Sequence, residues 1–213
     1  MPSSVGHRRV AGDPIRYVAL GDSYTIGTSV DPTDRWPDQL VRRLSATVPL
    51  RLVANLAVNG YTSGDVLARE VPEVASLQPD FATLLVGVND VVRGVPEATF
   101  RATAAAILDA LLRGLPPNRL LTVGTPDYTV TPEGAAYGDP AERRTAIVRF
   151  NAALAELAGA RSIAFVDVFD LSERAADDRR LVADDGLHPS GPQYALWVER
   201  IAPVVERLLA APR

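Results

Sequence analysis

The feature that most constrains this chain is the alternation of short apolar runs with longer segments of helical spacing. Five runs have the length of a strand: Tyr17–Leu20, Leu50–Val53, Phe81–Val86, Arg119–Val123 and Ile163–Val166. The segments between them repeat apolar residues at the spacing of an amphipathic helix. Strands joined by helix-length segments imply right-handed βαβ crossovers. We therefore expect an α/β fold built on a parallel five-stranded sheet.

The length of the chain and the placement of its loops predict a single domain. A chain of 213 residues fits one folded unit. Residues 1–15 are polar and interrupted by glycine and proline, so they are expected to form an arm before a domain at 16–213. Two long loops, Thr125–Pro140 and Asp167–Leu187, break the alternation, and loops of this length are usually functional or mobile.

Helical spacing also predicts which side chains face the core. Trp36 and Trp197 fall on apolar helix faces, and Val148 joins the stripe of the helix near 141–157. Pro96 suits the first turn of another helix. The last helix opens with Ser190-Gly191-Pro192-Gln193, a capping-box pattern.

Composition excludes several kinds of chemistry. The chain has no cysteine, and all 22 of its lysine or arginine positions are arginine, which rules out thiol nucleophiles, lysine Schiff bases and a phosphate-binding-loop lysine. The net charge of −4 argues against a nucleic-acid partner. No apolar run reaches membrane-spanning length, and the N-terminus lacks the apolar core of a signal peptide. We expect a cytoplasmic protein with no stable membrane insertion; the mature form of a secreted protein would have the same features.

Histidine is informative because the chain has only two. His7 lies in the expected arm, which leaves His188 as the candidate for histidine-based chemistry. Asp185 precedes His188 by three residues with a glycine between them, so a short turn could bring its carboxylate to the imidazole Nδ1. The alternative is a capped turn with a surface histidine. From these residues alone the two interpretations are about equal.

Ser23 follows the first strand, within L-G-D-S-Y at Leu20–Tyr24. Standing alone, a serine there is more often a helix cap than a nucleophile. However, ligands of open parallel sheets bind beyond the carboxyl ends of the strands. Gly60 follows the second strand, Asn89 the third and His188 the fifth, so these groups share one edge with Ser23. The shared edge favours a hydrolase with a serine nucleophile, in which backbone N–H groups and an amide could bind the oxyanion.

Four separated blocks resemble, in order, the SGNH hydrolases, also called the GDSL family of esterases and lipases. The blocks are G-D-S-Y at Gly21–Tyr24, N-L-A-V-N-G-Y-T at Asn55–Thr62, G-V-N-D at Gly87–Asp90 and D-G-L-H-P at Asp185–Pro189. Tyr24 stands where the family name has leucine, a common variation there. The resemblance covers nearly the whole chain and implies a flavodoxin-like three-layer α/β/α fold.

The resemblance also implies a mechanism. It makes Ser23 the nucleophile of a triad with His188 and Asp185, and it places the oxyanion-hole donors on Ser23, Gly60 and Asn89. Ester hydrolysis would then proceed through an acyl-enzyme without a cofactor. The family includes lipases, thioesterases, lysophospholipases and carbohydrate esterases, so the resemblance does not fix the natural ester. We predict a small-molecule ester with a small to medium acyl chain.

Other residues have structural alternatives. Tyr24, Tyr61, Tyr128 and Tyr137 are candidates for lining a substrate pocket, although partly buried packing is the simpler interpretation of each. Asp22 is expected to shape the turn, and Asp90 to brace the Asn89 loop. Asp184 competes with Asp185 for the imidazole, but the three-residue spacing favours Asp185. No metal site is expected, because the acidic residues of the second long loop lack supporting histidines and calcium-loop spacing.

The sequence disfavours three alternatives to an esterase of this family. An α/β-hydrolase would carry its nucleophile in G-x-S-x-G, and the serine context here, G-D-S-Y-T, lacks the second glycine. A nucleotide- or ligand-binding flavodoxin-like module would suit the sheet, but no glycine-rich phosphate motif follows a strand. A catalytically dead relative is disfavoured by the intact set of candidate residues.

Overall fold

The computed structural model describes residues 13–210 and contains one parallel sheet. Its strands are β1 (Ile15–Gly21), β2 (Leu50–Asn55), β3 (Phe81–Leu85), β4 (Leu120–Val123) and β5 (Ala164–Val166), arranged in the order β2-β1-β3-β4-β5. This confirms the α/β fold expected from the sequence, and the strand order is that of flavodoxin. β1 begins at Ile15, the last residue of the expected arm. Residues 1–12, with His7, lie outside the described residues.

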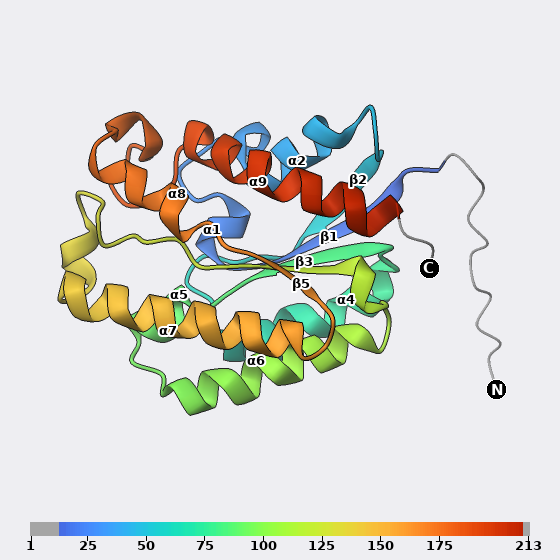
Figure 1. Ribbon diagram of the computed structural model, residues 1–213, viewed down its shortest axis with the longest axis horizontal. Helices are drawn as coiled ribbons and strands as arrows, with labels where there is room; N and C mark the ends of the chain where they lie inside the picture. Colours follow the sequence, from blue (N-terminus) through green and yellow to red (C-terminus); the bar gives the residue numbers. More distant parts are fainter. Residues whose placement is uncertain (1–12, 211–213) are drawn as a thin grey trace.

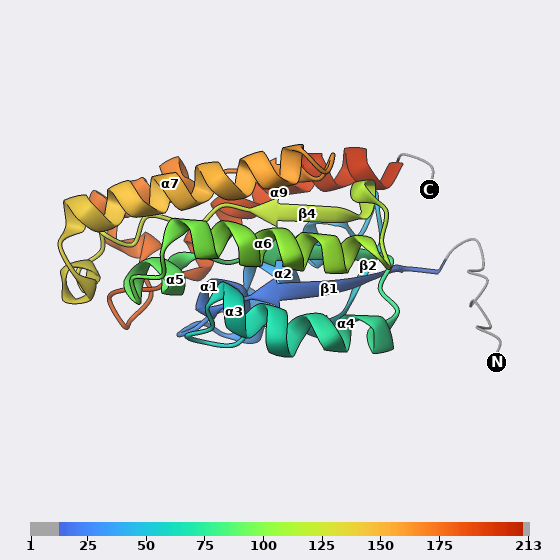
Figure 2. The same ribbon diagram turned by 90° about the horizontal axis from the view of Figure 1, so that it is seen from below.

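Helices cover both faces of the sheet, which gives the three layers. In Figure 1, α2 (Trp36–Leu44) and α9 (Gly191–Ala210) lie above the strands, while α4 (Val71–Leu77), α6 (Glu97–Leu112) and α7 (Pro140–Gly159) lie below them. Figure 2, seen from below, shows α4, α6 and α7 side by side over the sheet. Within residues 13–210, no helix is long and apolar enough to cross a membrane.

Short helical segments occupy the connections. The α-helical ones are α1 (Ser23–Ile26), α3 (Ser63–Asp65), α5 (Val88–Val92) and α8 (Phe169–Glu173); η2 (Val66–Glu70) is a π-helix; and the 3₁₀ turns are η1 (Pro32–Asp34), η3 (Pro117–Arg119), η4 (Gly134–Tyr137), η5 (Arg174–Ala176) and η6 (Arg179–Leu181). The two long loops expected from the sequence therefore contain turns of helix. The periodicity of apolar residues does not reveal such short segments, because they make only one or two turns.

Three local expectations need correction. Val148 is 48% exposed, because it lies on the outer side of α7 rather than on its apolar stripe. Pro96 is the N-cap residue of α6 and precedes its first turn. Only half of the expected capping box forms at α9: the backbone N–H of Gln193 donates to Ser190 Oγ, but the N–H of Ser190 donates to the carbonyl of Leu181 instead.

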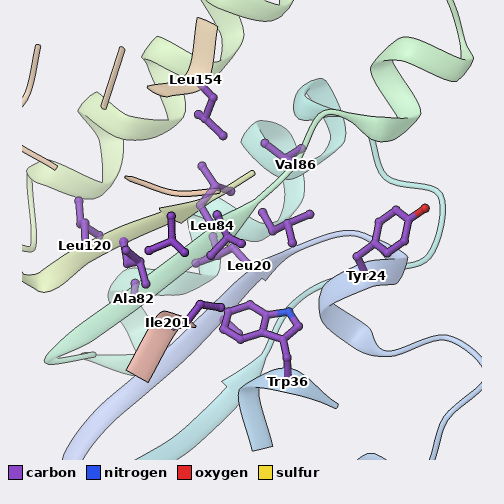
Figure 3. Close-up of a cluster of buried hydrophobic side chains, with 14 of the residues drawn as sticks. Leu20, Tyr24, Trp36, Ala82, Leu84, Val86, Leu120, Leu154 and Ile201 are labelled. Carbon is purple, nitrogen blue, oxygen red and sulfur yellow. The ribbon is translucent and has the colours of Figure 1, made fainter. Parts of the chain in front are cut away.

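The core lies on both sides of the central strands. Trp36 and Trp197 are fully buried, as the helical spacing predicts. Figure 3 shows the Trp36 ring close to Leu20 of β1 and Ile201 of α9, with Tyr24 drawn just beyond the end of β1. Truncating one of these aromatic side chains would cost about 3–5 kcal/mol. This packed core holds the carboxyl ends of the strands in place, where the candidate site lies.

Candidate active site

Ser23 stands at the turn where β1 ends and α1 begins. It is the first residue of α1, where a backbone N–H has no intrahelical acceptor. Asp22 is the N-cap, and its Oδ1 accepts a hydrogen bond from the N–H of Tyr24 at 3.0 Å. Gly21 makes the turn possible, since its φ is +148° and a Cβ there would stand 2.2 Å from the carbonyl oxygen of Leu85. Ser23 is thus held at the end of the strand, with its cap supplied by its neighbour.

Asp22 is scaffold in this geometry, as expected. Its side chain is fully buried. Burial raises the pKa of the Asp22 carboxyl to about 8, the Tyr24 N–H lowers it, and the nearby charge of Asp90 raises it further. The imidazole contacts a different carboxylate, that of Asp185.

The His188 ring and Asp185 form a close pair within one tight turn. His188 Nδ1 lies 2.6 Å from Asp185 Oδ2, while Asp185 Oδ1 accepts the backbone N–H groups of Leu187 and His188, each at 2.9 Å. Ser29 Oγ donates to Asp185 Oδ2 at 2.6 Å. The structure therefore brings Asp185, and not Asp184, to the imidazole.

These hydrogen bonds keep the Asp185 carboxylate charged. Its partial burial by itself would raise its pKa, but the donors from Ser29, the backbone of His188 and Leu187, and the imidazole together lower the pKa to about 2. An ionised carboxylate at Nδ1 favours the tautomer with the proton on Nδ1 and leaves Nε2 free to accept a proton.

Aromatic rings support the imidazole from the side opposite solvent. The Tyr24 ring lies 5.6 Å from that of His188 and 6.4 Å from that of Trp197, and Trp197 meets Tyr194 edge to face at 5.0 Å. Tyr24 is 3% exposed. The tyrosine next to the nucleophile therefore both packs in the core and orients the histidine.

Asn89, the second residue of α5, is bonded to the turn that follows Gly60. Asn89 Nδ2 donates to the carbonyl of Tyr61 at 2.9 Å, which uses one of its two N–H groups and fixes the orientation of the amide. Gly60 has a φ of +84°, and its carbonyl accepts from Arg93 Nη2 at 2.7 Å. Asp90 accepts from the N–H and Oγ of Ser63 at 2.8 and 2.6 Å. Asp90 thus ties α5, which carries Asn89, to the segment that follows Gly60.

One cavity joins these groups. It encloses about 390 Å³ including its mouth, and the described side chains that line it are Ser23, Tyr24, Asn59, Val88, Asn89, Val92, Tyr128, Tyr137, Leu187 and His188. Gly60 is not among them, although its neighbour Asn59 is. Of the hydrogen bonds among the described residues, none joins Ser23 Oγ to the imidazole; such bonds are often long before substrate binds.

The tyrosines expected at a pocket divide into two groups. Tyr24, Tyr128 and Tyr137 line the cavity, with the last two meeting edge to face at 6.0 Å. Tyr61 does not line it; the Arg69 guanidinium carbon lies 5.8 Å from its ring centroid. For Tyr61 the structure thus shows the alternative interpretation, a half-buried ring packed outside the cavity, while its carbonyl accepts from Asn89.

The long loop Thr125–Pro140 is fixed beside the site at two places. Arg144 of α7 forms ion pairs with the buried carboxylate of Asp127 and with Glu173. The N–H of Glu133 donates to the carbonyl of Gly186, in the His188 turn, at 3.0 Å. These links attach the wall that carries Tyr128 and Tyr137 to the turn that carries the imidazole.

Sequence reasoning missed several residues of the site. Ser29 contacts Asp185 across 156 positions of sequence, and no local pattern marks it. Val88, Val92 and Leu187 line the cavity; the first two lie on α5, which is too short to show helical periodicity. Among residues 13–210, no group of three or more histidine, aspartate or glutamate side chains is placed to hold a metal ion.

The carboxyl edge of this parallel sheet carries a serine turn, an imidazole–carboxylate pair and an oriented amide. These are the groups that serine hydrolases use as a class. The model of the GDSL-like Lipase/Acylhydrolase family matches residues 19–196. The chain belongs to this family, and it is an ester-hydrolysing enzyme. No curated protein sequence matches it significantly.

Solved structures show the same fold. The chain is similar to TesA, with 24% identity and a TM-score of 0.71 over 91% of this chain and 99% of TesA. It is similar to LAE5, an α/β hydrolase enzyme from the metagenome of Lake Arreo, Spain, with 20% identity and a TM-score of 0.71 over 91% of this chain and 96% of LAE5. It is also similar to Axe2, an acetylxylan esterase from Geobacillus stearothermophilus, with 21% identity and a TM-score of 0.69 over 94% of this chain and 96% of Axe2.

Proposed function

We propose that this protein is a serine esterase that hydrolyses carboxylic esters with small to medium acyl chains through an acyl-enzyme. Ser23 is the nucleophile, His188 the general base and acid, and Asp185 the carboxylate that orients the imidazole. The observation that carries the proposal is the 2.6 Å pairing of His188 Nδ1 with Asp185 at a cavity that also contains Ser23 and Asn89.

The reaction follows from the position of each group. Ser23 Oγ attacks the acyl carbon while its proton passes to His188 Nε2, and the carbonyl oxygen becomes an oxyanion. The backbone N–H groups of Ser23 and Gly60 and the second N–H of the Asn89 amide donate to that oxyanion. His188 then gives its proton to the departing alcohol. In the second half, His188 takes a proton from water as the water attacks the acyl carbon, and it then gives that proton to Ser23 Oγ as the acyl–oxygen bond breaks, which releases the acid and free Ser23.

The walls of the cavity support the preference for small to medium acyl chains. Tyr128, Tyr137, Val88 and Val92 enclose its apolar side, and its volume of about 390 Å³ includes the open mouth. The enclosed part that a water-sized group can occupy is only about 80 Å³, well below the roughly 300–1,000 Å³ of typical ligand pockets, so this cavity is small. A second hollow, lined by Glu133 and Ala136, meets the first at His188 and offers space for the alcohol.

The test is a series of p-nitrophenyl esters from acetate to palmitate, measured with the wild type, Ser23→Ala and Ser76→Ala. Ser76 is an exposed serine of α4 and serves as the matched control. We expect Ser23→Ala to lose the activity, Ser76→Ala to keep it, and kcat/KM to fall for the longest chains. Acyl thioesters and acetylated sugars, assayed beside the series, distinguish the related substrate classes. Equal activity of Ser23→Ala and wild type would overturn the proposal.

A further inference from the structure

Glu70 is a buried acid directly behind the nucleophile turn. It is 2% exposed, and its Oε2 accepts the backbone N–H of Gly21 at 2.9 Å. Gly21 is two residues before Ser23 and is the last residue of β1. The Glu70 carboxyl therefore contacts the chain at the point where the strand gives way to the turn that presents the serine.

The early end of the pairing between β1 and β2 explains why the Gly21 N–H needs a side-chain acceptor. Pairing between β1 and β2 ends at Ala19 opposite Asn55, and beyond it the N–H of Val58 donates to the carbonyl of Gly21 at 3.4 Å. The N–H and C=O of one strand residue point to the same side, so the Gly21 N–H faces the side that β2 has already left. The π-helix η2 ends at Glu70, and this side chain supplies the acceptor that the sheet no longer provides.

The Glu70 and Asp22 carboxyls each have a second oxygen, and these two oxygens are in the same situation. Glu70 Oε1 and Asp22 Oδ2 are both buried, and neither has a hydrogen-bond partner within the described part of the chain. The negative charges of Asp22 and Asp65 act on Glu70, and that of Asp90 acts on Asp22. Burial and these negative neighbours raise the pKa of both carboxyls. Two buried acceptors without a donor are costly, whereas one proton between them satisfies both.

We propose that Glu70 is a positioning residue for Ser23 and that it acts in its protonated form. Its Oε2 holds the N–H of Gly21, and its Oε1–H donates to Asp22 Oδ2, so that the Gly21–Ser23 turn is fixed from both sides. Once this proton is lost, both carboxyls are negatively charged and repel each other behind the nucleophile turn. The turn then shifts and the rate of acyl transfer falls. This inference rests on the proposed function.

The experiment compares Glu70→Gln and Glu70→Leu with the wild type and with Glu73→Gln. A glutamine keeps the acceptor for Gly21 and replaces the acid O–H with an amide N–H, but it cannot ionise. A leucine provides neither. Glu73, an exposed residue of α4, is the matched control for removing one glutamate charge. The hydrolysis of p-nitrophenyl acetate gives kcat and KM from pH 6 to 9.5, and urea unfolding gives stability from pH 5 to 9.

The expected rates separate positioning from a purely structural role. In the wild type and in Glu73→Gln, kcat falls above about pH 8. It falls tenfold per pH unit there, because each further unit lowers the fraction of protonated Glu70 tenfold. Glu70→Gln keeps most of the kcat at pH 6.5 and lacks this alkaline loss. Glu70→Leu loses about 10²-fold in kcat, the cost of an ångström-scale misplacement, with KM changed less than threefold.

The expected unfolding data follow from proton linkage. The folded protein keeps a proton that the unfolded chain releases near pH 4, so the contribution of this proton to stability is fully present below about pH 4 and is lost as pH rises toward 8. In the wild type the unfolding equilibrium constant therefore rises up to tenfold per pH unit between pH 5 and 8. Glu70→Gln flattens this rise.

Two results would overturn the proposal: the same alkaline loss and the same stability slope in Glu70→Gln and wild type, or a folded Glu70→Leu with unchanged kcat. If Glu70→Leu does not fold, the Glu70→Gln profile decides alone. If Ser23→Ala hydrolyses esters as fast as wild type, the proposed function fails, and the role of the Glu70 proton is then decided by the unfolding data.

Discussion

Replacing Asp185 by asparagine gives a sharp test of how the imidazole is held. In the native turn, Asp185 Oδ1 accepts two backbone N–H groups at 2.9 Å, while Oδ2 faces His188 Nδ1 and Ser29 Oγ, both at 2.6 Å. An asparagine must keep its carbonyl oxygen toward the two backbone donors. Its NH₂ group then takes the Oδ2 position and donates to Nδ1, which forces the proton of the neutral ring onto Nε2.

The size of the effect follows from the tautomer. An imidazole with its proton on Nε2 cannot accept the proton of Ser23, and the equivalent exchange in a serine protease triad lowers kcat about 10⁴-fold. This corresponds to about 5 kcal/mol in the activation free energy. Stability should change far less, by about 1 kcal/mol, because both backbone hydrogen bonds remain and only their charge assistance is lost.

Three measurements check this prediction. The kcat for p-nitrophenyl acetate gives the rate, urea unfolding gives the stability, and the ¹⁵N shifts of the ring report the tautomer directly, since the chain has only two histidines. The control is Asp184→Asn, an exposed neighbour that should leave all three unchanged. A folded Asp185→Asn protein with kcat within tenfold of wild type, or with the proton still on Nδ1, would refute the reasoning.

Three further changes have distinct expected outcomes. Ser29→Ala removes one donor to Asp185, so kcat should fall about tenfold. Because the folded pKa of Asp185 is depressed to about 2, its stabilisation is present above about pH 4 and lost toward pH 2. The unfolding free energies at pH 3 and pH 6 should therefore differ less in the variant than in the wild type. Gly60→Ala should cost about 1–2 kcal/mol in unfolding free energy for its left-handed φ and should also lower kcat more than tenfold. Gly94, with a φ of +68° and open space around it, is the control, and Gly94→Ala should show the stability cost alone. Equal kcat in the two variants would argue against Gly60 as a donor. Tyr137→Ala removes a half-exposed cavity wall, so the ester series should shift toward longer acyl chains with stability almost unchanged; an unchanged chain preference would exclude Tyr137 as the limit.

Local contacts at the site show where sequence reasoning stops. The turn Asp185–His188 was predictable because its hydrogen bonds span only two or three positions. The contact between Ser29 and Asp185 was not, because it depends on how two irregular loops meet across 156 positions. The same applies to Glu70. Its inward position requires a π-helix between α3 and α4, and a hydrophobic pattern does not encode that one-turn change of helical geometry.

The sequence by itself determined the parallel α/β sheet and the common edge for Ser23, Gly60, Asn89 and His188. The physical reason is that βαβ crossovers are right-handed and bring the carboxyl ends of all strands to one side. Tertiary structure decided what stands between and behind those residues: which serine supports the Asp185 carboxylate, which tyrosines line the cavity and which buried acid holds the nucleophile turn. These outcomes depend on side-chain packing between loops distant in the chain, and periodicity within one segment carries no record of it.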